Sequence, residues 1–506
     1  MDWKHGYFAE SGYTFGAYPE TFPVRMAWAA LLHGHAAPLQ GFRYLDAGCG
    51  QGLSLLLAAA CHPDSEFVGV DFMPEHVAHG TALARAAGLK NLTFVEADFS
   101  VLASDPQRFG SFDYAVCHGI TTWINPEVRS ALFRFVGAAL NPGGLFYNSY
   151  NVLPGWLAVS PFQHWVRLEQ QRLSGRAALQ AAQAQFAKLA ELNSGLIQHY
   201  PALKGRLKSM EGQDPAYLVQ EYNNQYWAPV YFTQMQQALS AEKLEYLGTA
   251  TLPEAFDANL PQAHREMLAA ESNLVLREQL KDFVLTQAFR RDISVKGRVP
   301  VWPNAMNRLL GDWQFVRLPW SARPEAGKPY TIKGGATELN GNAEVYAPVL
   351  DAIETAGEAG VSVATLKQTM PANVAPHLPQ VLSLLMHGGW IAPRMSELAN
   401  VSATAVNKAL AKAALEGAPY KFAVLPGTGQ PIVMHSTEWL WYTLDAEQVD
   451  PAQWATEAAN RLKALGRDLS KDGQPVTEPA AVKAMLDPAI EQYLQHKRDL
   501  FKTLGA

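Results

Sequence analysis

The chain has 506 residues, which is too long for one hydrophobic core and predicts about two to four domains. Its net charge is −6 and it has no run of basic residues, so the composition argues against a nucleic-acid partner. The three cysteines, Cys49, Cys61 and Cys117, fit reduced thiols rather than a disulfide framework. No apolar segment is long enough to cross a membrane, and residues 1–7 do not resemble a signal peptide. We therefore expect a cytoplasmic protein without membrane insertion.

The N-terminal flank is aromatic and rich in turn-forming residues. Residues 13–23 read YTFGAYPETFP, and they precede a predicted helix at residues 24–32. Two roles fit this segment. It is either a cap that covers the edge of a sheet or a lid over a bound ligand.

A glycine-rich turn joins the first predicted strand to the next helix. The strand covers residues 42–46, the helix covers residues 53–60, and between them lie Gly48, Gly50 and Gly52. Glycine tolerates positive φ, and the helix start offers free N–H groups to a ligand. The dinucleotide fingerprint needs a glycine where Leu53 stands. The spacing resembles instead motif I of class I S-adenosylmethionine (SAM) methyltransferases; a glycine-rich turn of another α/β protein is the alternative.

Four further strands are predicted at even spacing, at residues 66–71, 92–96, 112–117 and 145–150. Polar residues stand where strands end, namely Asp46, Asp71, Asp98 and His118. The carboxyl ends of parallel strands meet at one edge of the sheet, where such folds bind their ligands. Asp71 stands about twenty residues after the glycines, at the position where doubly wound folds place a carboxylate that binds ribose hydroxyls. We therefore expect SAM at this edge.

The resemblance to class I methyltransferases assigns the adenine end of the site. It implies that Asp98 binds the adenine amino group and that Phe99 packs against the ring. Tyr13 is the aromatic residue that we expect near the sulfonium. The other predicted cofactor-binding residues are Asp46, Gly48, Cys49, Gly50, Gly52, Asp71, Phe72, His118 and Gly119.

A set of motifs beyond the glycine turn points to a narrower family. They are Tyr18-Pro19, residues 117–123 (CHGITTW), Ser149-Tyr150-Asn151, Pro154-Gly155-Trp156 and residues 217–222 (YLVQEY). Together they resemble the bacterial class I methyltransferases that carry a methyltransferase regulatory domain. That family includes protein-lysine methyltransferases acting on outer-membrane proteins. The resemblance implies a SAM-dependent methyltransferase with a protein substrate and lysine acceptors.

Methyl transfer from SAM depends mainly on positioning the acceptor and excluding water, because the methyl group is already activated. A lysine acceptor needs no strong general base, since burial lowers the pKa of its ammonium group. The predicted catalytic residues are Tyr13, His118, Trp123, Tyr150 and Asn151. The predicted substrate-binding residues are Trp123, Trp156, Glu221 and Tyr222, and core packing is the alternative role for the aromatic residues that follow residue 216. No zinc or phosphate-loop motif is present, so we expect no metal.

The predicted fold class is α/β, with a Rossmann-like class I methyltransferase sheet, a mainly helical insertion and a C-terminal α+β region. Residues 243–249 and 290–295 are expected to complete the sheet as an antiparallel pair. The predicted domains are a SAM-binding domain at 1–155 completed by about 240–300, a helical insertion at 156–240, linker strands with a winged-helix-like module at 301–400, and a C-terminal domain at 401–506. We interpret the insertion as the regulatory domain and a lid.

The winged-helix-like module, residues 345–394, raises DNA binding as an alternative. Its third predicted helix, residues 374–386, contains no Lys or Arg, although phosphate binding needs clustered cations. We therefore expect protein contact or self-association, such as a homodimer. Two alternatives to a protein methyltransferase stay open: a small-molecule methyltransferase with a closed acceptor pocket, and a SAM-binding scaffold without turnover.

Overall fold

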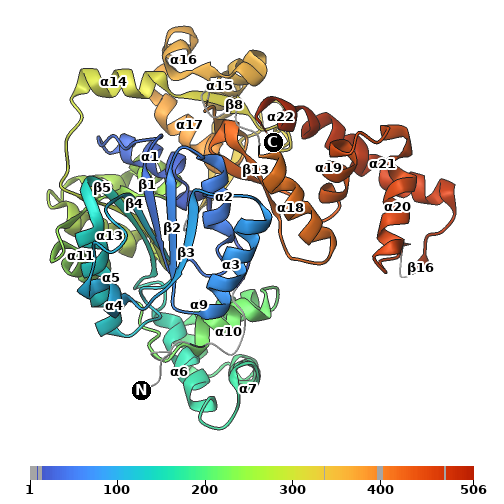
Figure 1. The fold of residues 1–506 in the computed structure, drawn as a ribbon. Coiled ribbons are helices and arrows are strands. Elements are labelled where there is room, and N and C mark those ends of the chain that lie inside the picture. Colours follow the sequence, from blue (N-terminus) through green and yellow to red (C-terminus); the bar gives the residue numbers. More distant parts are fainter. Residues whose placement is uncertain (1–7, 9–13, 335–336, 396–402, 472–473, 506) are drawn as a thin grey trace.

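The computed structural model describes residues 8, 14–334, 337–395, 403–471 and 474–505. A central sheet is flanked by helices, with a helical insertion at one end of the sheet, residues 303–393 at the opposite end, and the last part of the chain at one side (Figure 1). Among the described residues, no helix is both long and apolar enough to cross a membrane.

The central sheet has seven strands in the order β3-β2-β1-β4-β5-β7-β6. Strands β1 to β5 are parallel, and β7 is antiparallel to both of its neighbours. The predicted antiparallel pair at residues 243–249 and 290–295 is confirmed. The strands are β1 (Arg43–Ala47), β2 (Glu66–Asp71), β3 (Leu92–Glu96), β4 (Phe112–His118), β5 (Leu140–Asn151), β6 (Leu244–Thr249) and β7 (Phe289–Lys296).

Helices cover both faces of this sheet because alternate strand residues are apolar on each side. Helices α1, α2 and α3 share one hydrophobic cluster with one face, and α4, α5 and α11 share a second cluster with the other face. These helices are α1 (Pro23–Leu32), α2 (Leu53–Cys61), α3 (Pro74–Ala86), α4 (Phe99–Ser104), α5 (Pro126–Ala139) and α11 (Phe232–Ser240).

The insertion between β5 and α11 has a small hydrophobic core of its own. Its helices are α6 (Ser160–Glu169), α7 (Gly175–Glu191), α8 (Gly195–His199), α9 (Pro201–Met210) and α10 (Pro215–Asn223). Helix α7 ends at Glu191 and α8 begins at Gly195, because the chain turns at Asn193, where φ is +46°. The backbone of residues 228–230 bonds to Thr122, Asn151 and Leu153, so the insertion is fastened to the ends of β4 and β5.

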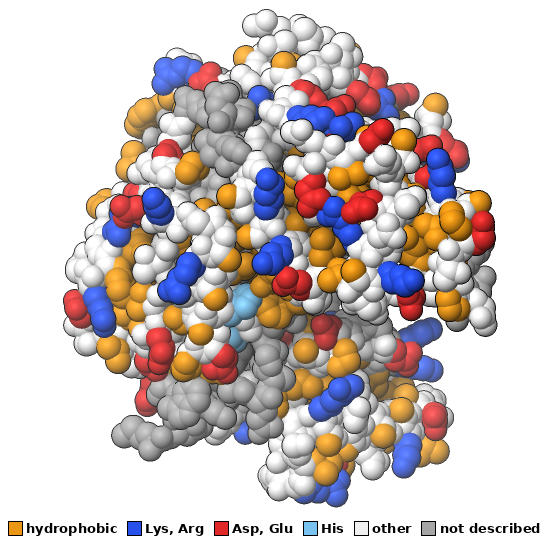
Figure 2. All heavy atoms as spheres, turned by 45° about the vertical axis from the view of Figure 1, so that its right-hand side comes forward, with side chains coloured by type: hydrophobic (Ala, Val, Ile, Leu, Met, Phe, Trp, Pro, Cys, Tyr) orange, Lys and Arg blue, Asp and Glu red, His pale blue; other side chains and the backbone are white. Residues whose placement is uncertain are grey.

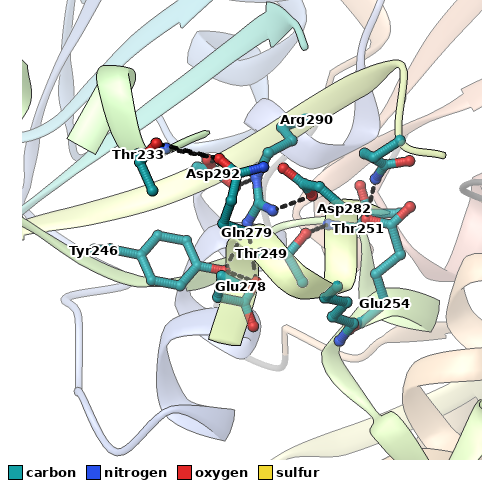
Figure 3. A network of polar contacts seen from close by, with 12 residues as sticks. Thr233, Tyr246, Thr249, Thr251, Glu254, Glu278, Gln279, Asp282, Arg290 and Asp292 are labelled. Atoms are coloured by element: carbon teal, nitrogen blue, oxygen red, sulfur yellow. Dashed lines mark hydrogen bonds and ion pairs between the residues drawn. The ribbon is translucent and has the colours of Figure 1, made fainter. Parts of the chain in front are cut away.

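Two helices, α12 (Gln262–Ala269) and α13 (Leu274–Leu285), precede β7, and a buried ionic network joins β7 to α13. The Arg290 guanidinium lies between Glu278, Asp282 and Asp292, at 3.0, 2.6 and 3.0 Å (Figure 3). Tyr150 of β5 donates a 2.6 Å hydrogen bond to Asp292. The buried cation is thus matched by several acids, which fixes the antiparallel strands against α13.

The first part of the C-terminal region contains a three-stranded sheet in the order β11-β8-β12 and a β9-β10 hairpin. Its elements are α14 (Pro303–Asp312), β8 (Gln314–Arg317), β9 (Tyr330–Gly334), β10 (Thr337–Gly341), α15 (Ala343–Ala356), β11 (Val361–Ser362), α16 (Val363–Thr369), α17 (Leu378–His387) and β12 (Ile391–Pro393). The third helix of the expected winged-helix-like module begins at Leu378, after a 3-10 turn at Ala375–His377. The likeness of this module to a winged helix stays a prediction.

The last part of the chain packs on α2 through a β13-β14 hairpin and extends away from the sheet through α20 and α21 (Figure 1). Its elements are α18 (Thr404–Leu415), β13 (Phe422–Leu425), β14 (Gln430–Val433), α19 (Glu438–Ala446), α20 (Trp454–Ala464), β15 (Ser470–Lys471), β16 (Gln474–Pro475), α21 (Pro479–His496) and α22 (Arg498–Thr503). One hydrophobic cluster runs from the sheet through α1 and α2 into this region. The C-terminal half therefore shares a core with the sheet.

Candidate active site

The glycine turn after β1 forms the floor of the site. Gly48, Gly50 and Gly52 have φ values of +88°, +53° and +75°, a conformation that favours glycine. A Cβ at Gly48 would overlap the Ile120 side chain, and one at Gly52 would lie 2.5 Å from the Phe94 ring. The turn therefore needs glycine both for its backbone shape and for its close packing.

Asp71, at the end of β2, holds this turn in place. Its Oδ2 accepts a 2.9 Å hydrogen bond from the Gly50 N–H, and its Oδ1 accepts one of 2.9 Å from the Met73 N–H. His76 Nδ1 lies 3.2 Å from the same Oδ1. The Asp71 carboxylate thus shapes the backbone of the turn; its predicted contact with ribose hydroxyls stays a prediction.

Two cavities adjoin the glycine turn, with about 770 and 450 Å³ of empty space, which includes solvent at their open mouths. Gly48, Gly50 and His118 line both cavities. Predicted site residues that line the first are Gly48, Gly50, Asp71, Phe72, Asp98, Phe99, His118, Gly119 and Trp123. Those that line the second are Asp46, Gly48, Cys49, Gly50, Gly52 and His118. The structure thus brings together every predicted cofactor-binding residue that it describes; Tyr13 lies outside the described residues.

His118, at the end of β4, lies where the two cavities meet. Its Nδ1 is 3.0 Å from the Tyr147 hydroxyl and 3.1 Å from the Ser149 hydroxyl. The Tyr18 ring stacks on the imidazole, with 3.7 Å between ring centroids. Burial and the nearby Arg291 cation lower the pKa of His118 to about 3, so the imidazole is neutral at physiological pH.

Asp46 supplies a carboxylate to the second cavity. Among the described residues, no hydrogen bond or ion pair reaches its side chain, and burial followed by repulsion from Asp71 raises its pKa to about 7. A cation in this cavity would stabilise the charged form of Asp46. The cationic methionine end of SAM fits this cavity, and the adenosine end fits the larger, apolar cavity lined by Phe72 and Phe99.

The other predicted site residues do not line either cavity. Tyr150 bonds to Asp292, and the Asn151 amide donates a 2.6 Å hydrogen bond to Glu221 Oε1. Trp156, Glu221 and Tyr222 are buried in the insertion, at 4%, 2% and 0% exposure. Their catalytic and substrate-binding roles stay predictions.

Sequence reasoning missed several polar and aromatic residues that line the second cavity, namely Thr14, Tyr18, Thr21, Gln51 and Ser54. Gln51 and Ser54 could have been predicted from the sequence, since they lie within or just after the glycine turn. Tyr18 and Thr21 come from the 3-10 turn η1 (Pro19–Thr21) and its cap, and only the fold brings this segment over the turn.

A sheet of this order, with a glycine turn and a bipartite cavity at its carboxyl edge, defines a class I methyltransferase. Residues 45–144 match the family model of a methyltransferase domain, and residues 214–296 match that of a predicted methyltransferase regulatory domain. The chain is 30% identical to the uncharacterized protein sll1526 of Synechocystis over 519 aligned positions, which cover 100% of both chains. The chain belongs to the family of class I methyltransferases with a methyltransferase regulatory domain; it is a SAM-dependent methyltransferase.

Solved structures share this fold over almost the whole chain. PKMT2 from Rickettsia typhi aligns with a TM-score of 0.74 at 19% identity, covering 97% of this chain and 99% of that one. PKMT2 in complex with AdoHcy aligns with a TM-score of 0.72 at 20% identity and the same coverage. The insertion and the C-terminal region therefore belong to a whole-chain architecture that recurs outside this protein.

Proposed function

We propose that this methyltransferase modifies lysine side chains of protein substrates. The observation that carries the proposal is the place of His118, a neutral imidazole that lines both cavities. The sulfonium of SAM joins the adenosine half to the methionine half, so the reacting methyl belongs where these cavities meet. An acceptor must therefore approach beside His118.

The chemistry of His118 suits an amine acceptor. Bound SAM supplies an activated methyl group. With its pKa near 3, His118 does not store a proton; it orients the acceptor through a hydrogen bond. Burial of the acceptor favours the neutral amine, because a desolvated ammonium loses its proton more easily. Burial and then Asp71 raise the pKa of Asp46 to about 7, and a cationic side chain that approaches this edge would favour its charged form.

We assign the choice of acceptor to the insertion, α6 to α10. It is fastened to the ends of β4 and β5 by the Glu221–Asn151 hydrogen bond and by the backbone of residues 228–230. Trp123 lines the larger cavity, so it is our preferred substrate contact. Trp156, Glu221 and Tyr222 support the insertion from within.

The winged-helix-like module is assigned a protein-packing role. Helix α17, which would be its recognition helix, is covered by α1: Trp28 Nε1 donates to Ser383 Oγ at 2.8 Å, and Arg25 donates to the Met386 carbonyl at 3.1 Å. On the face shown in Figure 2, acidic and basic side chains are interspersed rather than gathered into a basic patch. Both observations favour protein partners over DNA.

The experiment that tests the proposal follows the methyl group. Full-length protein is incubated with methyl-labelled SAM and an extract of the source organism, and the labelled protein is hydrolysed to amino acids. We expect the label in methyl-lysine. Label in the small-molecule fraction would replace the proposal with the small-metabolite alternative, and SAM binding without any transfer would leave the scaffold alternative.

A further inference from the structure

Two hydrogen bonds connect the C-terminal region to the glycine turn. His79, on α3, has its Nδ1 2.7 Å from the carbonyl oxygen of Gln51. Its Nε2 lies 2.7 Å from the hydroxyl of Tyr420, a residue just before β13. Gln51 stands between Gly50 and Gly52 and lines the second cavity. A residue of the C-terminal region thus reaches the cofactor site through one histidine.

The chemistry of the groups fixes the direction of both bonds. A carbonyl oxygen only accepts, so Nδ1 of His79 carries the proton and donates to Gln51. The second nitrogen of a neutral imidazole is then an acceptor, and the Tyr420 hydroxyl donates to it. The Tyr420 hydroxyl therefore selects the tautomer and ring orientation with which His79 holds the turn.

Tyr420 is itself held rigidly. It is 7% exposed, and its carbonyl accepts a 2.8 Å hydrogen bond from Nε1 of Trp439, which is fully buried. The Phe15 ring makes T-shaped contacts with both partners, with ring centroids 5.1 Å from His79 and 5.9 Å from Tyr420. Phe15 belongs to the N-terminal segment that contributes Thr14 and Tyr18 to the second cavity.

We propose that Tyr420 is a positioning residue for SAM. Through His79 it fixes the Gln51 carbonyl, and with it the peptide groups of the turn that receive the cofactor. The C-terminal region, which is outside both matched family domains, therefore contributes to cofactor affinity. The inference concerns SAM binding alone and holds for any methyl acceptor.

The first test is calorimetric titration of full-length Tyr420→Phe with SAM. Loss of one hydrogen bond that positions the turn is expected to weaken SAM binding about three- to ten-fold. Tyr493→Phe is the matched control, because Tyr493 is 1% exposed, lies in the same region and has a hydroxyl that bonds to nothing in the part of the chain that the structure describes. The control is expected to bind SAM like the wild type. Wild-type affinity in a folded Tyr420→Phe would overturn the proposal.

A second pair of variants separates positioning from general stability. His79→Gln keeps one donor and one acceptor, whereas His79→Leu has a similar size and neither. We expect His79→Gln to retain affinity within about three-fold and His79→Leu to lose about ten-fold or more. The SAM-induced rise in melting temperature should follow the same order. Equal affinities in the two variants would overturn the proposal, whatever the stability of Tyr420→Phe.

Discussion

At the scale of single residues, Asp71 and His118 at the strand ends make hydrogen bonds that shape the protein itself. Asp71 accepts hydrogen bonds from the backbone of the glycine turn and of the next helix start. His118, which burial and the Arg291 cation keep neutral, lies between hydroxyl groups and the Tyr18 ring. Each residue therefore offers a variant whose effects on folding and on binding can be separated.

Asp71→Asn is expected to weaken SAM binding at least about ten-fold and to lower stability by about 1–3 kcal/mol. The amide keeps only one acceptor oxygen, so either Gly50 or Met73 loses its hydrogen-bond partner. Calorimetry and urea unfolding measure the two effects. The control is Asp64→Asn, which changes an exposed acid that accepts a hydrogen bond from Gly41. An Asp71→Asn variant with wild-type affinity would contradict the site.

The lowered pKa of His118 predicts a pH dependence. The unfolded chain takes up a proton on this histidine below about pH 6.5, whereas the folded protein does so only near pH 3. The contribution of His118 to the free energy of unfolding is therefore fully present above pH 6.5 and is lost as the pH falls from there towards 3. Relative to His118→Gln, the wild type should lose up to about 1.4 kcal/mol per pH unit between pH 6 and 4. Urea unfolding at several pH values checks this, and a constant difference would refute it.

At the scale of elements, the turn between β1 and α2 works because its neighbours leave no room for side chains. Gly52 and Gly80 both face the Phe94 ring, and Gly69 of β2 faces it as well. The ring of a β3 residue thus fills the space that three glycines leave. The start of α2, with its free N–H groups, is thereby set at a fixed place beside the second cavity.

Gly52→Ala should lower the free energy of unfolding by at least about 2 kcal/mol, because the new methyl meets both an unfavourable φ and the Phe94 ring. Gly88→Ala is the control: its φ is +71°, yet nothing lies within 4 Å of the added Cβ. That variant should lose only about 1 kcal/mol. If urea unfolding shows equal losses, the packing of Phe94 does not constrain the turn.

At the scale of the whole molecule, three parts of the chain converge on one edge of the sheet. The insertion holds the ends of β4 and β5, the N-terminal segment places Tyr18 on His118, and the C-terminal region contacts α2 and α3. The Glu221 carboxylate is central to the first attachment, since it accepts hydrogen bonds from Asn151, Trp227 and Tyr217.

Burial raises the pKa of Glu221 to about 7, which makes the attachment of the insertion sensitive to pH. The unfolded carboxyl ionises near pH 4.5, so the folded protein retains a proton that the unfolded chain has lost. The contribution of Glu221 to the free energy of unfolding is fully present below pH 4.5 and is lost as the pH rises towards 7. Glu221→Gln, which does not titrate, should therefore gain stability relative to the wild type between pH 5 and 7, by up to about 1.4 kcal/mol per unit. Thermal unfolding over this range tests the prediction; a gap that narrows would contradict it.

The local pattern of the chain was enough to predict the sheet. Strands β2 and β3 begin and end where short runs of strand-forming residues with acids at or just after their ends placed them, and the antiparallel pair was predicted as well. These features depend on neighbouring residues, so they can be read from short segments. The same holds for Asp46, Asp71, Asp98 and His118, because strand ends are fixed by local sequence.

Other features follow from contacts between distant segments, and only the tertiary structure decided them. Tyr18 reaches His118, and Tyr420 reaches His79, across 100 and 341 positions of the chain. Asn151, the last residue of β5, and Glu221 on α10 form a hydrogen bond because the fold brings α10 back to the end of β5. The sequence thus determined the class of enzyme through its local motifs. The packing of remote segments decided which side chains support the site. Burial of apolar surface brings such segments together whatever their separation along the chain.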